Sequence, residues 1–215
     1  MDSDVEKTEQ IKLNEAQLQT RSRWKLLAVL AVCAMPLVAS YVTYYFIKPT
    51  GRTNYGDLID PRQYPIPAAL DSTALDGKPL ALDAYKGKWI MLKVGPSDCQ
   101  QACQDQLFAM RQLRTMQGKE MERIERVWLI TDDQPLDTVM MRVQDGTHML
   151  RASAAAVARW LPVEPGGSAA DHVYLIDPLG NLMMRFPKGA VSSDLETVKK
   201  VNKDIGKLLK ASAIG

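Results

Sequence analysis

The chain has 215 residues, and 27 Lys and Arg against 25 Asp and Glu leave a formal net charge of +2. This near balance, without a basic stretch that also carries aromatic side chains, argues against a nucleic-acid-binding protein. Three cysteines are too few for a disulfide-rich scaffold, and the length fits one domain with additional segments.

The first segments of the chain predict a membrane anchor. Residues 1–23 are polar and charged, as expected of a cytoplasmic tail. No charged residue occurs from Leu26 to Ile47, and at 1.5 Å per residue this stretch spans about 30 Å, the thickness of a bilayer's hydrocarbon layer. With Trp24 at one end and tyrosines at the other, residues 24–47 are predicted to form a transmembrane helix.

The flanking charges predict the orientation of this helix. Arg21, Arg23 and Lys25 lie close to its N-terminal end, which favours a cytoplasmic N-terminus in the inner membrane and a periplasmic C-terminal domain. A cleaved signal peptide is the alternative. However, the apolar run is longer than a typical signal core, and no small-x-small cleavage site follows it. Cys33 lies inside the span, and we expect no metal role for it.

A linker and a folded domain are expected after the span. Residues 48–67 are rich in proline and glycine, which predicts an extended, semi-rigid spacer. Residues 68–215 then alternate between patterns typical of strands and of helices. Predicted strands cover a hairpin at 75–82, then 89–94, 127–131, 147–150, 173–176 and 182–186. Predicted helices cover 99–117, 137–143, 153–161 and 195–209, the last opened by a capping box at Ser193–Glu196.

Strands and helices in alternation, followed by a terminal hairpin and helix, predict an α/β domain of three layers with a mixed sheet.

Within this domain, the apolar strand 89–94 runs into a Gly-Pro-Ser-Asp turn, and Cys99 and Cys103 follow. In a helix that begins at or just before Cys99, this spacing places both sulfurs on one face, with Cβ atoms about 5–6 Å apart. Such a pair can form a disulfide or place two thiolates on one metal ion, and a helix N-terminus favours the thiolate of the first cysteine.

A purely structural disulfide is the alternative for this pair. Closing so short a loop removes little chain entropy, so stability gives little reason for the bond. We therefore interpret the pair as a redox or metal site. The chain has two histidines, His148 and His172, and His148, inside a predicted strand, is expected to be structural. The methionines at 110, 183 and 184 are expected to fill the core.

Several of these features together resemble the Sco/SenC group of membrane-anchored, thioredoxin-like assembly factors for cytochrome c oxidase. The lead-in Gly87-Lys88-Trp89, the Cys99-x-x-x-Cys103 pair and the segment from Asp171-His172 to Gly180 carry the resemblance, together with the anchor. It implies a thioredoxin-like fold and a copper site, Cu(I) or Cu(II), formed by Cys99, Cys103 and His172. The implied partners are an oxidase subunit or another copper or thiol assembly factor.

Two positions depart from that group's pattern. Gln104 stands where a proline usually follows the second cysteine. His172 lies about three positions closer to its strand than the usual histidine, and an odd shift changes the face that a strand residue occupies.

Three functions follow as hypotheses. The first is a copper chaperone, in which target thiolates displace Cys99 and Cys103 one at a time. The second is an enzyme, a thiol-disulfide oxidoreductase whose attacking thiol is the more exposed one, expected to be Cys99. The third is a non-catalytic assembly or scaffold protein.

Overall fold

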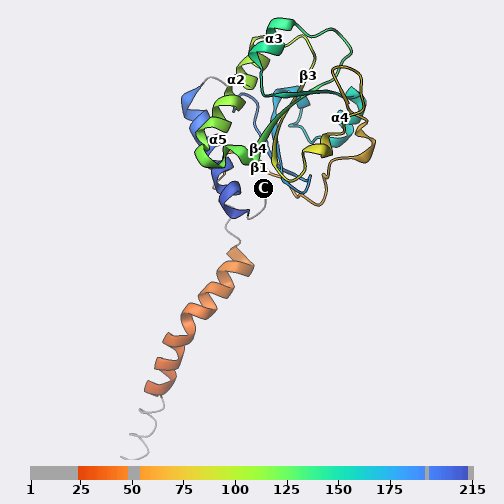
Figure 1. The fold of residues 1–215 in the computed structure, drawn as a ribbon. Helices are drawn as coiled ribbons and strands as arrows, with labels where there is room; N and C mark the ends of the chain where they lie inside the picture. Colours follow the sequence, from red (N-terminus) through yellow and green to blue (C-terminus); the bar gives the residue numbers. More distant parts are fainter. Residues whose placement is uncertain (1–23, 48–53, 192–193, 213–215) are drawn as a thin grey trace, which may run out of the picture. The chain divides into compact units, whose positions relative to one another are not determined.

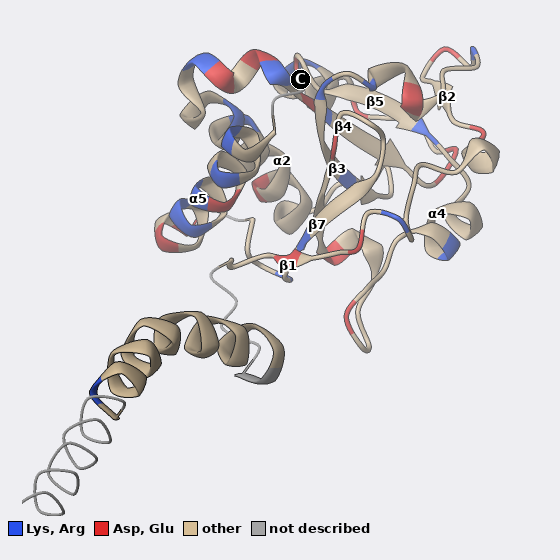
Figure 2. Ribbon diagram, turned by 90° about the horizontal axis from the view of Figure 1, so that it is seen from below, with Lys and Arg blue, Asp and Glu red and all other residues tan. Residues whose placement is uncertain are grey.

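The computed structural model describes residues 24–47, 54–191 and 194–212, which belong to two units divided between Arg52 and Thr53. In the first unit, the helix Trp24–Tyr45 has a mean hydropathy of 2.2 and is long and apolar enough to cross a membrane. Its end, Thr43–Ile47, is π-helical. Figure 2 shows Lys or Arg on this helix only near its N-terminal end. The expected tail, residues 1–23, lies outside the described residues.

The second unit is built on a seven-stranded mixed sheet with the order β1-β7-β6-β3-β4-β5-β2. The strands β3, β4 and β5 are parallel to one another, and β6, β7, β1 and β2 join antiparallel. Their bounds are β1 Asp57–Leu58, β2 Thr73–Ala74, β3 Trp89–Gly95, β4 Ile124–Ile130, β5 His148–Arg151, β6 Val173–Ile176 and β7 Leu182–Phe186.

Helices cover both faces of this sheet (Figure 1). They are α2 Gln101–Met116, α3 Thr138–Val143, α4 Ala154–Trp160 and α5 Leu195–Ala211, with short 3-10 helices η2 Ala68–Leu70, η3 Leu82–Tyr85, η4 Gly118–Arg123 and η5 Ala169–Asp171. Apolar side chains of α2 and α5 pack on one face, which we call the α2/α5 core. Those of α4 pack on the other face, the α4 core.

Strand β3 lies in the middle of the sheet, and all its residues are buried. Because side chains alternate along a strand, Trp89 and Met91 enter the α2/α5 core, whereas Ile90 and Leu92 enter the α4 core. A strand covered on both faces needs a continuous apolar run, and the sequence 89–94 supplies one, broken only at Lys93.

The predicted three-layer α/β domain with a mixed sheet is confirmed, and the strands and helices predicted from residue 89 onward have their counterparts. The hairpin predicted at 75–82 is different: β2 is Thr73–Ala74, a single bridge joins Thr73 to Pro79, and η3 begins at Leu82. Two helix starts also differ. The helix expected from residue 99 begins at Gln101, with Gln100 as its N-cap. The N-cap of α5 is Asp194, whose side chain accepts a hydrogen bond from the Thr197 amide, and Ser193 lies outside the described residues.

The expected linker, residues 48–67, is corrected by the structure. Residues 48–53 lie outside the described part, but residues 54–67 belong to the folded unit. The Ile59 amide donates to Met183 O at 3.0 Å, and Tyr64 O accepts from the Leu182 amide, also at 3.0 Å. With β1 paired to β7, this proline-rich segment completes one edge of the sheet. Prolines are compatible with such a position because an edge strand leaves amides on one side unpaired.

Candidate functional site

The two cysteines of the folded unit lie where β3 passes into α2. Strand β3 ends at Gly95, and Cys99 precedes the helix N-cap, Gln100. Cys99 and Cys103 form a disulfide, with Cα atoms 5.3 Å apart. The structure therefore brings the predicted pair together, with the first cysteine in the turn and the second in the first turn of the helix.

Hydrogen bonds hold this turn in place. The Ser97 amide donates to Asp132 Oδ2 at 3.0 Å, and the Cys99 amide donates to Ser97 O at 2.9 Å. Gln104 Nε2 donates to Cys99 O at 2.8 Å, so the glutamine that replaces the usual proline fixes the first cysteine. Burial opposes ionisation of Asp132, but hydrogen bonds from Ser97 and Gln134 and the charge of Arg151 outweigh it and lower the pKa of this carboxyl.

The two sulfur-bearing residues differ in exposure. Cys99 is only 7% exposed and belongs to the α2/α5 core, whereas Cys103 is half-buried. Cys103 also lines a cleft of about 390 Å³, and Cys99 does not. The expectation that Cys99 is the more exposed thiol is therefore wrong, because the helix begins after Cys99 and leaves this residue beneath the turn.

The wall of the cleft facing Cys103 comes from η5 and the loop after β7. Ala170, Asp171 and Lys188 line it, together with Gln106 from α2. Gln106 Nε2 donates to Asp171 O at 3.1 Å, and Lys188 Nζ lies 3.0 Å from Asp171 Oδ1. Hydrogen bonds from the Ser168 amide and from Lys188 lower the pKa of the Asp171 carboxyl.

A buried lysine lies behind this wall. Lys93 of β3 is 1% exposed, and its ammonium donates to Ala170 O. Burial lowers the pKa of Lys93 to about 8, against the opposing influence of the Asp171 carboxylate. The sequence analysis missed this residue. The available signal was a lysine inside an otherwise apolar strand that leads directly to the cysteines.

The third predicted ligand, His172, contacts Phe186 of β7 and Tyr174 of β6. It is fully buried just before β6, its Nδ1 is 3.0 Å from Phe186 O, and its ring lies 6.0 Å from that of Tyr174. Tyr174 belongs to the α4 core, on the sheet face opposite Cys99. His172 Nε2 has no hydrogen-bond partner among the described residues.

The copper site of Cys99, Cys103 and His172 stays a prediction, because the two sulfurs are bonded to each other in this conformation. In the part of the chain that the structure describes, no group of three or more His, Cys, Asp or Glu side chains is placed to hold a metal ion. The second histidine, His148, has Nε2 3.1 Å from Glu125 Oε2, and its ring packs 4.4 Å from that of Tyr85. Both contacts agree with a structural role for His148.

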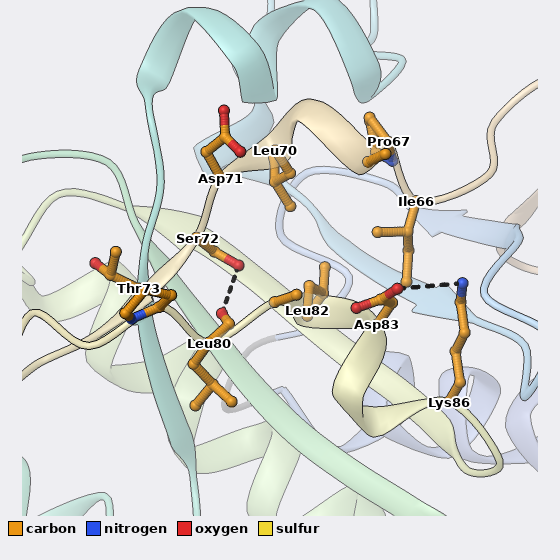
Figure 3. Close-up of a pocket in the computed structure, with 13 residues that line it drawn as sticks. Ile66, Pro67, Leu70, Asp71, Ser72, Thr73, Leu80, Leu82, Asp83 and Lys86 are labelled. Atoms are coloured by element: carbon orange, nitrogen blue, oxygen red, sulfur yellow. Dashed lines mark hydrogen bonds and ion pairs between the residues drawn. The ribbon is translucent and has the colours of Figure 1, made fainter.

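A larger cavity of about 650 Å³ lies elsewhere, between residues 66–73 and 79–86 (Figure 3). Its polar contacts are local: Ser72 Oγ donates to Leu80 O at 2.8 Å, and Lys86 Nζ lies 3.7 Å from Asp83 Oδ2. No cysteine or histidine lines it. The cavity therefore has no thiol or imidazole to take part in chemistry, and the cleft beside Cys103 is the stronger candidate site.

Comparisons with known proteins agree with the α/β fold described above. Residues 89–212 match the family model described as the transmembrane-like, thioredoxin-like C-terminal domain. No curated protein matches the chain.

Among solved structures, a SCO1/SenC family lipoprotein from Bacillus anthracis is similar with a TM-score of 0.51 and 20% identity, over 72% of this chain and 98% of that chain. Yeast Sco1 with copper bound has a TM-score of 0.51 and 18% identity, over 66% of this chain and 87% of its own. These likenesses show that the chain has the thioredoxin-like fold of Sco proteins.

Proposed function

This chain belongs to the transmembrane-like, thioredoxin-like C-terminal domain family, and on that premise we propose that it is a membrane-anchored thiol redox factor that assists assembly of the copper centre of cytochrome c oxidase. The observation that carries the proposal is the Cys99–Cys103 disulfide, with Cys103 on a cleft and Cys99 beneath it. One accessible and one shielded sulfur are what stepwise thiol-disulfide exchange requires.

The exchange follows from these positions. In the reduced protein, the Cys103 thiolate attacks a disulfide of the target and forms a mixed disulfide, while one target sulfur leaves as a thiolate. Cys99 then attacks Cys103 Sγ, the second target thiolate leaves, and the Cys99–Cys103 disulfide is formed. Two electrons pass to the target, whose cysteines become able to take up copper. A dithiol donor returns the Cys99–Cys103 pair to the reduced state.

We also propose that the N-terminal helix anchors this chemistry at a membrane. The helix Trp24–Tyr45 is long and apolar enough to span one. From the basic residues at its N-terminal side we propose a single pass through the inner membrane, with the redox domain in the periplasm. An oxidase subunit or another copper or thiol assembly factor is the proposed target.

Trapping of the mixed disulfide tests this function. In Cys99→Ser, the attacking Cys103 is present but the resolving thiol is missing, so we expect a covalent complex with the target on a non-reducing gel. Cys103→Ser should form none, and the control Cys33→Ser should behave like the unaltered chain. We also expect Cys99→Ser/Cys103→Ser to lower oxidase activity and its copper content several-fold. Unchanged oxidase in that double variant would reject the redox role and favour a scaffold.

Copper carriage by the reduced pair is the second candidate. Two thiolates on neighbouring positions are soft donors of the kind that Cu(I) prefers, and yeast Sco1, which shares the fold, has been solved with copper bound. The test is the copper retained by the purified, reduced full chain. Retention that is lost in Cys99→Ser/Cys103→Ser and unaffected in His172→Asn would support a site without the histidine. Failure to retain copper would leave the redox role alone.

A further inference from the structure

A buried cation lies at the centre of the sheet and has no part in the exchange described above. Lys93 pairs with Trp128 of β4 on one side and with Val173 of β6 on the other. At 1% exposure it is a rare case, because lysines are almost never fully buried unless they are paired. Among the described residues it forms a hydrogen bond to Ala170 O and no ion pair.

The position of the ammonium relates it to the cysteines. By strand alternation Lys93 lies on the same sheet face as Met91, which is the face of the α2/α5 core and of Cys99. The carbonyl that it binds belongs to Ala170, which lines the cleft together with Cys103. The Lys93 ammonium is therefore linked to the cleft through Ala170, whose carbonyl oxygen it binds.

The neighbouring charges leave this cation incompletely balanced. The carboxylate that acts on Lys93 is that of Asp171, and Asp171 is already paired with Lys188, whose side chain is 70% exposed. Lys188 also lines the cleft, so the two lysines approach the same site, one from the protein interior and one from solvent. Solvent and salt screen the charge of Lys188 far more than that of Lys93.

We propose that Lys93 is a positioning residue that makes the Cys99–Cys103 pair a stronger oxidant, by stabilising the thiolate that forms when the disulfide is reduced. Reduction breaks the S–S bond and adds two electrons, and one sulfur keeps its negative charge if its proton is released to solvent. A buried cation stabilises this charged product and leaves the neutral disulfide nearly unaffected, so the reduction potential rises. The inference rests on a redox-active pair, as in the proposed function, but not on any particular target.

The expected change in the reduction equilibrium of the cysteine pair follows from electrostatics. A buried unit charge that acts on a thiolate through partly buried surroundings changes an equilibrium constant by about tenfold. For a two-electron couple, a tenfold change corresponds to about 30 mV. Loss of the Lys93 charge should therefore make the pair about tenfold harder to reduce.

Equilibration of the full chain in detergent with glutathione buffers at pH 7 tests this. The fraction of reduced pair is read by alkylation in a Cys33→Ser background, which removes the third thiol. Lys93→Met removes the charge and the hydrogen bond, and Lys93→Gln removes the charge but keeps an amide donor for Ala170 O. Lys188→Met is the matched control, because it removes a lysine from the same cleft on the solvent side.

We expect both Lys93 variants to shift the equilibrium about tenfold toward the disulfide, and Lys188→Met to shift it less than twofold. The proposal is overturned if both folded Lys93 variants keep the original potential, if only Lys93→Met shifts it, or if Lys188→Met shifts it equally. Should Lys93→Met fail to fold, Lys93→Gln decides alone. The trapping experiment with Cys99→Ser is independent of these potentials, so failure of the proposed function is seen separately.

Discussion

Single residues show where this fold departs from the rule that buried strands contain only apolar side chains. Lys93 interrupts an apolar strand in the centre of the sheet, and its ammonium exchanges water for one carbonyl, that of Ala170. Desolvation disfavours the charged form, and this is the cause of the lowered pKa of about 8. Such a residue costs stability, and residues that break the local pattern in this way occur mostly at functional sites.

Replacement of this lysine should therefore stabilise the protein. A pKa that falls from the ordinary 10.5 to about 8 corresponds to roughly 3 kcal/mol. The lost hydrogen bond to Ala170 offsets about 1 kcal/mol. We expect Lys93→Met to raise the free energy of unfolding at pH 7 by about 2 kcal/mol, measured by denaturant titration of the full chain in detergent.

The desolvation argument also predicts how the stability gained in Lys93→Met changes with pH. Below about pH 8 the lysine is charged in both the folded and the unfolded chain, so its full cost is present. Between about pH 8 and 10.5 the unfolded chain binds more protons than the folded one, and stability rises with pH. The advantage of Lys93→Met should therefore shrink across this window. An advantage that stays constant up to pH 10 would contradict the desolvation argument.

At the scale of elements, the segment before β1 is tied to the last helix. The side chain of Asp204, 2% exposed in α5, accepts hydrogen bonds from the amides of Tyr55 and Gly56 and lies 3.0 Å from Lys207 Nζ. Asp57 of β1 also lies 2.7 Å from Arg185 Nη2 of β7. These contacts explain why a proline-rich segment, otherwise typical of a linker, belongs to the folded unit.

Removal of this carboxylate should loosen both elements. Asp204→Ala leaves two buried amides without an acceptor and Lys207 without its carboxylate, so we expect a loss of about 3 kcal/mol in the free energy of unfolding. Hydrogen exchange should accelerate at residues 55–58 before the rest of the sheet. As a control, Lys199→Ala breaks an exposed pair with Glu196 and should cost less than about 0.5 kcal/mol. Equal losses in the two variants would show that the buried carboxylate has no special role.

At the scale of the whole molecule, the chain combines a thioredoxin-like domain with one apolar helix. The described side chains of the helix Trp24–Tyr45 are almost all exposed. Lipid suits such an apolar surface, because the interior backbone of a helix satisfies its own hydrogen bonds. The length and hydropathy of this helix make it a candidate membrane anchor.

Charges within this helix should release the protein from the membrane. An arginine near the centre of a span costs about 2.5–3.5 kcal/mol for insertion. We expect the full chain to resist extraction by alkaline carbonate, and Leu30→Arg/Val38→Arg to appear in the soluble fraction. The size-reducing control Leu30→Ala/Val38→Ala should stay in the membrane. Retention of the arginine variant would argue against a spanning helix.

Local patterns were enough for the central strands and the helices of this fold and for the cysteine pair, but not for the short edge strands β1 and β2. Continuous apolar runs identified the strands, turn residues separated them, and the spacing of four residues brought Cys99 and Cys103 within reach of each other. These features depend on neighbouring residues, whose interactions are set by the geometry of a strand or a helical turn. The anchor was readable for the same reason, because its length and lack of charge are properties of one continuous stretch.

The tertiary structure decided what depends on residues far apart in the chain. Only the start of α2 at Gln101 shows that Cys99 is buried and Cys103 lines the cleft. Only the packing of η5 against β3 shows that Lys93 lies behind that cleft, and only the tertiary structure shows that His172 contacts Phe186 O and the ring of Tyr174. Sequence periodicity can name the two faces of a strand, but which distant residues cover each face is set by how the chain packs.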